Sequence, residues 1–168
     1  MKRKKSSYAR PKRLYESTRI KEENSLKKKY GLKNKTEIWK AIAKIRYYRK
    51  RAMDLAAEGN REKQEAFFEK LKVLGFPITS SSDVLGLNVE NVLKRRLPTL
   101  VAEKKFANTV KHARQLVVHK KVLINGRVVN SPSYIVPTAY ESQISIRQKA
   151  KQEKTSETIS ESSGEGNA

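Results

Sequence analysis

The chain has 168 residues, with 38 Lys and Arg against 17 Asp and Glu, so its formal net charge at pH 7 is +21. Hydrophobic residues make up 37% of it and charged residues 33%, which allows a modest core but not a large one. Cysteine is absent, which excludes disulfides, cysteine zinc sites and thiol nucleophiles and favours an intracellular protein. No apolar run approaches the roughly 20 residues of a membrane helix, and residues 1–14 lack the apolar segment of a secretory signal. We therefore expect a soluble protein that is not exported, with one domain or two small ones.

The positive charge is concentrated in two zones of the chain. Residues 1–50 carry 19 basic and 4 acidic groups and residues 91–146 carry 10 and 2, whereas residues 51–90 carry 5 and 7. Such zones attract polyanions, because neutralised phosphates release their condensed counterions. A nucleic acid is therefore the first candidate partner. An anionic membrane ranks well behind it, because Trp39 is the only tryptophan that could anchor a basic amphipathic helix.

Residues 1–30 are interpreted as a basic N-terminal arm. Residues 1–13 contain almost nothing to bury and should be disordered alone. On a phosphate-rich surface the arm would become ordered, with Tyr8 and Tyr15 stacking on bases, and the alternative is a solvated tail. Its candidate contact residues are Lys2, Arg3, Lys4, Lys5, Arg10, Lys12 and Arg13.

Residues 31–87 are predicted to form a helical domain. Thr36 is a suitable N-cap, and apolar residues follow at spacings of three and four from Ile38 to Ala56, which predicts a helix of about twenty residues. Its other faces carry cations that lie either in solvent or on phosphates, including the candidate contacts Arg46, Arg49 and Lys50.

A second helix is expected around Phe67 and Leu71, and Gly75 and Pro77 should end it. The run Thr-Ser-Ser-Ser-Asp at 79–83 is predicted to be a loop.

Residues 88–146 are predicted to form a second domain that begins with two helices. Asn88 should cap a short helix that ends before Pro98, because the residue before a proline disfavours helical dihedrals. The next helix should begin near Asn108 or Thr109 and end near His119. On a helical wheel one side of it is apolar and the other polar. Val110, Ala113, Leu116 and Val117 share the first side, and Lys111, Arg114, Gln115 and Val118 the second.

A β-hairpin is expected directly after this helix. Residues 122–129 form two short β-rich runs around Asn125 and Gly126, and Asn-Gly is the strongest short-range signal for a type I′ turn. Residues 131–134 should turn the chain, and 134–136 and 144–146 are candidate strands. Residues 147–168, rich in Lys, Gln, Glu, Ser and Thr, are interpreted as a disordered tail.

No convincing catalytic or metal site is evident. His112 and His119 are the only histidines, and their spacing of seven differs from the usual i, i+4 pair of metal ligands. No phosphate-binding glycine loop is present either. We predict no enzyme activity, no cofactor, no metal and no small-molecule substrate.

The second basic zone resembles the RNA-binding domain first defined in small-subunit ribosomal protein four. The resemblance covers about fifty residues: Arg95-Arg96-Leu97, residues 113–119 (ARQLVVH) and residues 122–134 (VLINGRVVNSPSY). Where family members often have His-Gly-His, this chain has His119-Lys120-Lys121, and we expect the lysines to contact phosphates.

Upstream segments resemble the N-terminal part of the archaeal and eukaryotic branch of the same ribosomal protein. They are residues 30–35 (YGLKNK), 37–39 (EIW), 45–46 (IR) and 84–87 (VLGL). The resemblance implies a cytoplasmic, structural component of the small ribosomal subunit that binds its RNA early in assembly. It also implies a role in translational accuracy and contacts with neighbouring proteins, notably small-subunit protein five. The zinc site of bacterial relatives is not carried over, because the chain has no cysteine.

The expected fold is α+β, with a helical N-terminal region wrapped around a small RNA-binding domain of two helices, a β-hairpin and further short strands. A free regulatory RNA-binding module and a DNA-binding helix-turn-helix protein remain as alternatives. The candidate RNA contacts in the second domain are Arg95, Arg96, Lys104, Lys105, Asn108, Thr109, Lys111, Arg114, Gln115, His119, Lys120, Lys121, Asn125, Arg127, Asn130, Ser131 and Tyr134.

Overall fold

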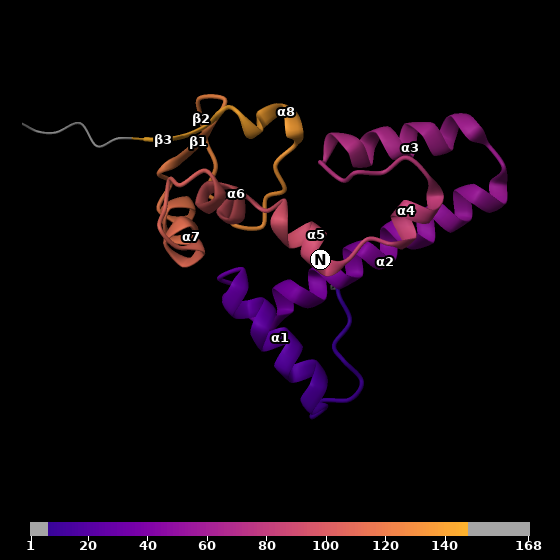
Figure 1. The fold of residues 1–168 in the computed structure, drawn as a ribbon, viewed down its shortest axis with the longest axis horizontal. Helices are drawn as coiled ribbons and strands as arrows, with labels where there is room; N and C mark the ends of the chain where they lie inside the picture. Colours follow the sequence, from indigo (N-terminus) through magenta and orange to yellow (C-terminus); the bar gives the residue numbers. More distant parts are fainter. Residues whose placement is uncertain (1–6, 148–168) are drawn as a thin grey trace, which may run out of the picture.

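The computed structural model describes residues 7–147. Figure 1 shows the helices α2 and α3 side by side at one end and α6, α7 and a small sheet at the other, with α5 between them. The elements are α1 (Ser17–Lys29), α2 (Lys35–Glu58), α3 (Arg61–Val73), α4 (Ser81–Leu85), α5 (Val89–Lys94), α6 (Leu97–Glu103), α7 (Val110–Val118), β1 (Val122–Ile124), β2 (Arg127–Val128), α8 (Thr138–Glu141) and β3 (Ile144–Ile146).

The helix α2 is the long helix that the apolar spacing predicts. With 24 residues it spans roughly 36 Å, and it begins after Asn34 rather than after Thr36. It ends at Gly59, whose φ of 66° is the left-handed conformation that glycine adopts without strain. Its buried residues lie three or four apart on one stripe: Ile38, Ala41, Ile45, Tyr48, Ala52 and Leu55.

The helix α1 lies within the segment predicted to be an arm, where no helix was expected. Its buried residue is Glu23 rather than an apolar side chain. The Glu23 carboxylate accepts hydrogen bonds from Arg19 at 2.8 Å and from the Trp39 indole at 2.9 Å, and it pairs with Lys35 at 3.2 Å. Burial raises the pKa of Glu23, but these donors outweigh burial and lower it. A buried polar contact therefore attaches α1 to α2.

The helix α3 forms as predicted, because the Asn60 side chain caps it by accepting a bond from the Lys63 N–H at 3.2 Å. The prediction of a loop at 79–83 is wrong in part, since Ser81–Leu85 is the helix α4. The Ser80 hydroxyl accepts from the Asp83 N–H, and the Asp83 carboxylate accepts from the Ser80 N–H. This reciprocal capping turns the serine-rich run into a helix start.

The prediction of one helix ending before Pro98 is also wrong, because two helices occupy this stretch. The helix α5 ends before Arg95, and α6 begins at Leu97 with Pro98 in its first turn. The first N–H groups of a helix have no partner within it, so the missing N–H of proline costs nothing there.

The β-hairpin forms as predicted. Asn125 and Gly126 have φ values of 49° and 73°, and both signs fit a type I′ turn. The strand β1 pairs antiparallel with β2 and with β3, so the sheet order is β2-β1-β3. The strand at 144–146 is thus confirmed, whereas at 134–136 only Ile135 forms an isolated bridge, with Arg96.

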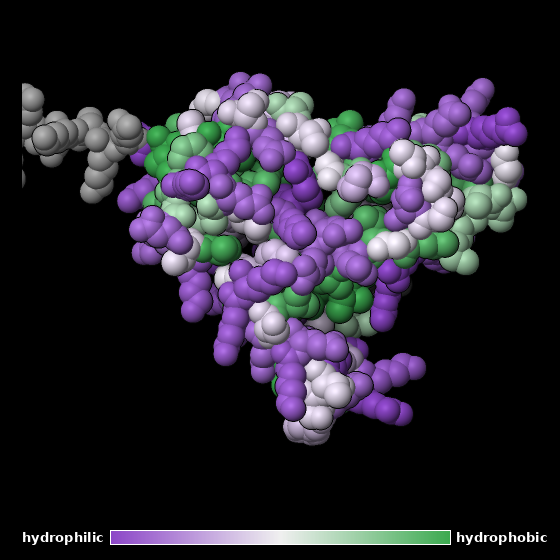
Figure 2. Space-filling model, viewed as in Figure 1, coloured by the Kyte–Doolittle hydropathy of each residue, from purple (hydrophilic) through white to green (hydrophobic). Residues whose placement is uncertain are grey.

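The core consists of two hydrophobic clusters. The first runs from Tyr30 to Leu93 and the second from Leu97 to Ile144. Along the chain, the first cluster gives way to the second a few residues after the domain boundary expected between 87 and 88, because Val92 and Leu93 of α5 belong to the first cluster. The predicted α+β class is confirmed. Hydrophilic residues cover most of the face in Figure 2, and no helix within residues 7–147 is long and apolar enough to span a membrane.

Candidate nucleic-acid interface

The helix α7 exposes a polar face opposite its buried one. Thr109 caps its start by accepting a hydrogen bond from the His112 N–H at 3.2 Å. Ala113 and Val117 are completely buried, whereas Lys111 and Gln115 are exposed. This division follows the predicted helical wheel, and it leaves a cation and an amide facing solvent.

Further cations follow at the end of α7, where Lys121 lines one hollow together with Gln115 and His119. Lys120 has a φ of 58°, and its N–H donates to the Val117 carbonyl at 3.0 Å. The Lys121 N–H donates to the Leu116 carbonyl at 3.0 Å, which completes a Schellman motif in which glycine usually takes the place of Lys120. His119 and both lysines are exposed. The structure therefore places a lysine where the backbone favours glycine.

The hairpin after α7 carries further exposed polar residues. Arg127 in β2 is exposed, and so is Asn125 in the turn. Asn130 and Ser131 are exposed after β2, whereas Tyr134 is half-buried and its backbone carbonyl accepts from the Leu97 N–H at 2.9 Å. We name the exposed group Lys111, Gln115, His119, Lys120, Lys121 and Arg127 the α7–hairpin surface.

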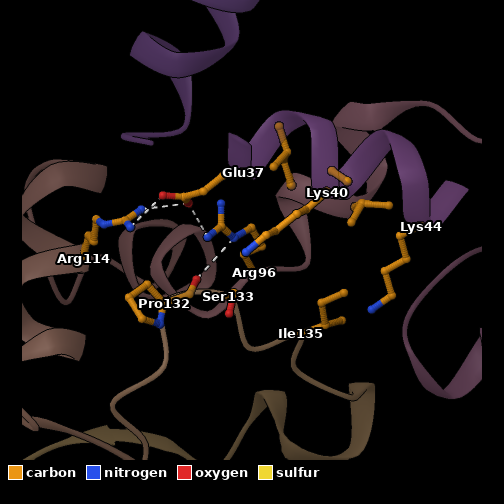
Figure 3. A pocket seen from close by; sticks show the side chains of 11 residues that line it. Glu37, Lys40, Lys44, Arg96, Arg114, Pro132, Ser133 and Ile135 are labelled. Carbon is orange, nitrogen blue, oxygen red and sulfur yellow. Dashed lines mark hydrogen bonds and ion pairs between the residues drawn. The ribbon is translucent and has the colours of Figure 1, made fainter. Parts of the chain in front are cut away.

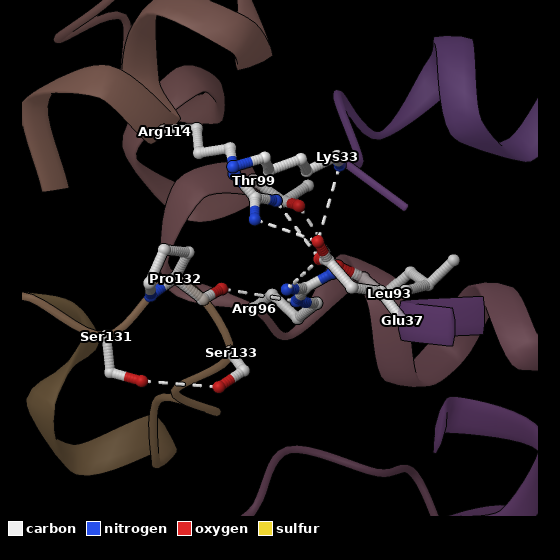
Figure 4. Close-up of polar contacts among 9 residues, drawn as sticks. All are labelled: Lys33, Glu37, Leu93, Arg96, Thr99, Arg114, Ser131, Pro132 and Ser133. Carbon is white, nitrogen blue, oxygen red and sulfur yellow. Dashed lines mark hydrogen bonds and ion pairs between the residues drawn. The ribbon is translucent and has the colours of Figure 1, made fainter. Parts of the chain in front are cut away.

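Arg96 and Arg114 both bind Glu37 (Figure 4). Arg114 makes a two-point ion pair with Glu37 at 3.0 and 2.8 Å. Arg96 is only 7% exposed, donates to the same carboxylate at 2.6 Å and also donates to the Pro132 carbonyl at 3.2 Å. The guanidinium groups thus join α2 to the second domain.

The neighbouring arginines strongly change the pKa of the Glu37 carboxylate. Burial alone would raise its pKa, but hydrogen bonds from Arg114 and Arg96 outweigh burial and lower the pKa to about 2. The backbone N–H of Lys33 donates to the same carboxylate at 3.3 Å. Glu37 is therefore charged at neutral pH and holds both arginines.

Arg95 is also engaged within the protein. Its guanidinium donates to the carbonyls of Leu74 and Val136 at 3.1 and 2.9 Å and pairs with Glu141 at 3.0 Å. A Cβ on Gly75 would come within 2.5 Å of that guanidinium. Long-range carboxylate and carbonyl partners thus hold Arg95, Arg96 and Arg114, whereas the lysines of the α7–hairpin surface are exposed. Contact of these arginines with RNA stays a prediction.

The remaining candidates of this domain also divide into residues with a partner inside the protein and exposed residues. Lys104 donates to the backbone carbonyl of Glu141 and is half-buried. Lys105 and Asn108 are exposed near the start of α7, and Thr109 is exposed while it caps that helix.

The first basic zone forms a separate exposed region on α2 and the segment before α1. Arg46 and Lys50 are exposed, whereas Arg49 is half-buried and donates to the Leu87 carbonyl at 2.8 Å. The Tyr8 ring lies 6.0 Å from that of Trp39, so residues near the chain start rest against α2. The predicted contacts Arg10, Lys12 and Arg13 are exposed, and Lys2, Arg3, Lys4 and Lys5 lie outside the described residues.

A cavity between the two domains brings together residues that were not selected as candidates. It has a volume of about 310 Å³, and Lys40 and Lys44 of α2 line it opposite Ser133 and Ile135. The spacing of four residues places both lysines on one face of α2, and this spacing could have identified them as candidates from the sequence. Within residues 7–147 no group of three or more His, Cys, Asp and Glu side chains is arranged to hold a metal ion.

Comparison with known proteins connects these features to a family. The S4 domain model matches residues 95–141, which include α6, α7 and the hairpin. The chain is 41% identical to small ribosomal subunit protein uS4 of Methanococcus aeolicus, covering 83% of this chain and 82% of the relative. It is 40% identical to the uS4 protein of Methanosphaera stadtmanae over 94% and 91% of the two chains. The uS4 protein of Pyrobaculum calidifontis is 39% identical over 87% and 96%.

These relatives are named as ribosomal proteins, in agreement with the prediction that the chain is not an enzyme. Their similarity extends far beyond the S4 domain and includes α2, which supplies Glu37. The fold, the S4 domain and this identity over most of both chains show that the chain belongs to the uS4 family of small ribosomal subunit proteins.

Proposed function

We propose that this protein is a structural constituent of the small ribosomal subunit and binds its ribosomal RNA directly. The α7–hairpin surface carries the proposal, because its cations are exposed and lie within the S4 domain match. Side chains cannot easily enter the deep, narrow major groove of A-form RNA. The surface therefore reads mainly the shape and the phosphates of the RNA.

The cations on α2 and on residues 7–13 extend this proposal to a second contact region. Arg46 and Lys50 are exposed there, as are Arg10, Lys12 and Arg13. Two contact regions on different parts of one folded protein would hold two separate RNA segments close to each other. This supports a role in nucleating assembly of the subunit body.

The family resemblance adds the finer parts of the proposal. The protein acts in the cytoplasm within the small subunit, contacts neighbouring proteins including protein five, and contributes to translational accuracy. None of these parts requires a cofactor or a small-molecule substrate.

Ultraviolet crosslinking in cells, followed by sequencing of the attached RNA, tests the proposal. Crosslinks concentrated at one junction of the small-subunit RNA are expected. Crosslinks scattered over transfer or messenger RNAs would instead favour a free regulatory module. Competition with duplex DNA of equal length checks the DNA-binding alternative, and we expect DNA to compete poorly.

A further inference from the structure

The cavity between α2 and residues 131–135 has the features of a ligand site (Figure 3). Its volume of about 310 Å³ lies at the lower end of the roughly 300–1,000 Å³ of small-molecule sites. Both domains line it, and the Glu37 ion pairs hold its two walls together. The side chains of Lys40 and Lys44 extend from α2 toward it.

The charge on the cavity wall is unbalanced. Glu37 is the acidic residue of the lining, and Arg96 and Arg114 already bind its carboxylate. Within residues 7–147 no carboxylate pairs with Lys40 or Lys44, and their ammonium groups each lie 5.9 Å from a ring centroid, that of Tyr8 and that of Tyr48 respectively. Lys44 is half-buried, and this burial lowers its pKa. A bound anion would supply the missing counter-charge to both ammonium groups.

The rest of the cavity wall is apolar, which a phosphate alone would not use. Val92 and Leu93 of α5 contribute to it, and Pro132 and Ile135 lie on the opposite segment. The Ser133 hydroxyl is exposed beside them and bonds to the Ser131 hydroxyl at 3.2 Å. A ligand with one anionic end and one flat, largely apolar end fits these two walls.

Unstacked nucleotides combine these properties, and proteins recognise RNA sequence mainly in single-stranded loops, bulges and ends whose bases are splayed out. We propose that the cavity holds one unstacked nucleotide of the bound RNA, with its phosphate on Lys40 and Lys44 and its base against Pro132 and Ile135. This inference rests on the proposed RNA binding and adds a site to it. No residue of the α7–hairpin surface lines this cavity, so the contact would add one position in the RNA.

Matched variants of the full chain separate the two ends of this nucleotide. Replacing Lys40 and Lys44 with Ala removes the phosphate contact, and Ser133→Trp fills the base end without changing charge. Replacing Lys70 and Lys72 on α3 with Ala removes two exposed charges elsewhere, and Ser142→Trp adds the same ring at an exposed position outside the cavity. Circular dichroism melting of each variant checks that it is folded.

Binding to a small-subunit RNA transcript is measured for each variant at several salt concentrations. We expect the double lysine variant to lower the salt slope by about 0.7, the value for one phosphate of a single strand. Ser133→Trp should weaken binding by about tenfold, the lower range for loss of one bound base, with the slope unchanged. The variant without Lys70 and Lys72, and Ser142→Trp, should each behave as the unmodified protein. If the lysine variant or Ser133→Trp matches its control, the nucleotide site is overturned.

A second probe distinguishes this inference from the proposed function. Adenosine monophosphate and inorganic phosphate are titrated separately into the full chain while backbone NMR signals are recorded. Adenosine monophosphate should shift residues 132–135, and Ser133→Trp should abolish these shifts. Equal shifts with inorganic phosphate, or none with either, would overturn the base site. Failure of the unmodified protein to bind the RNA transcript would refute the proposed function instead, whatever the nucleotide does.

Discussion

Arg114 and Glu37 lie 77 positions apart in the sequence, and their side chains form a two-point ion pair at 3.0 and 2.8 Å. Glu37 belongs to the first turn of α2 and Arg114 to α7. Arg96, at the start of α6, binds the same carboxylate. One acidic residue therefore joins α2 both to α7 and to the start of α6.

Replacing Glu37 with Gln should destabilise the folded protein. The change leaves Arg96 and Arg114 partly buried without a counter-charge, and breaking such a pair costs about 3 kcal/mol. Urea unfolding measures the loss. Glu65→Gln on the exposed face of α3 is the matched control and should change stability by less than about 0.5 kcal/mol. Equal losses in both variants would show that the ion pairs contribute nothing.

The lowered pKa of Glu37 predicts a specific acid sensitivity. Its pKa of about 2 in the folded protein lies below the ordinary value of 4.5. The contribution of Glu37 to stability is therefore complete above about pH 4.5 and is lost as the pH falls toward 2. Hydrogen bonds from the backbone and side chains of Thr79 and Ser80 also lower the pKa of Asp83 to about 2. Asp83 therefore adds to the loss of stability in acid, and it does so equally in every Glu37 variant.

Thermal unfolding over this pH range tests that prediction. The unmodified protein should lose stability more steeply on acidification than Glu37→Gln. Only the unmodified protein has a carboxylate at position 37 whose ion pairs are lost on protonation. Parallel pH profiles for the two proteins would mean that the Glu37 pKa is not lowered by folding.

Lys111 and Arg114 should give opposite results although they are close neighbours on α7. Lys111→Ala should lower the salt slope of RNA binding by roughly 0.7–0.9 and leave stability unchanged, because this lysine is exposed. Arg114→Ala should mainly reduce stability, since its guanidinium binds Glu37. Filter binding and urea unfolding of both variants make the comparison. A stable Arg114→Ala protein with a lower slope would return Arg114 to the RNA surface.

Lys120→Gly should stabilise the protein while it weakens RNA binding. The φ of 58° at Lys120 costs an L residue roughly 1 kcal/mol, and glycine avoids this cost. The same change removes an exposed cation from the α7–hairpin surface. Lys121→Gly, at a residue without a positive φ, serves as the control and should not stabilise the protein. Unchanged RNA affinity in Lys120→Gly would remove this lysine from the interface.

Gly126→Val should destabilise the hairpin through backbone strain alone. Its φ is 73°, and a Cβ there would meet nothing within 4 Å, so no clash contributes. We expect a loss of about 1–2 kcal/mol in thermal unfolding. Gly86→Val is the matched control, because Gly86 has a φ of −76° and ordinary contacts. If both variants melt at the same temperature, the positive-φ turn is not needed.

Local signals in the sequence predicted the elements that depend on neighbouring residues. The apolar spacing from Ile38 gave α2, and Asn125-Gly126 gave the hairpin, because both patterns act over a few residues. The helix α1 was missed because its buried residue is Glu23, which has no place in an apolar pattern. The helix α6 was missed because a proline within the first turn looks the same in the sequence as one that follows a helix.

The candidate interface was predicted less completely than the fold. Exposed cations such as Lys111 and Arg127 lie where the helical wheel and the hairpin placed them. Arg96 and Arg114 could not be separated from them, because a charge in a sequence does not reveal a carboxylate 59 or 77 positions away. Lys40 and Lys44 became notable only when the fold placed residues 131–135 opposite them.

The S4 domain matches residues 95–141, but the carboxylate that neutralises its Arg96 and Arg114 belongs to Glu37, which lies outside that range. A fragment cut at Arg95 would keep Arg96 and Arg114 and lose the acid that neutralises them. Arg96 and Arg114 would then form a new exposed cationic patch that could bind any polyanion. Excision would therefore not release a simpler copy of the native RNA-binding module, but a less selective one.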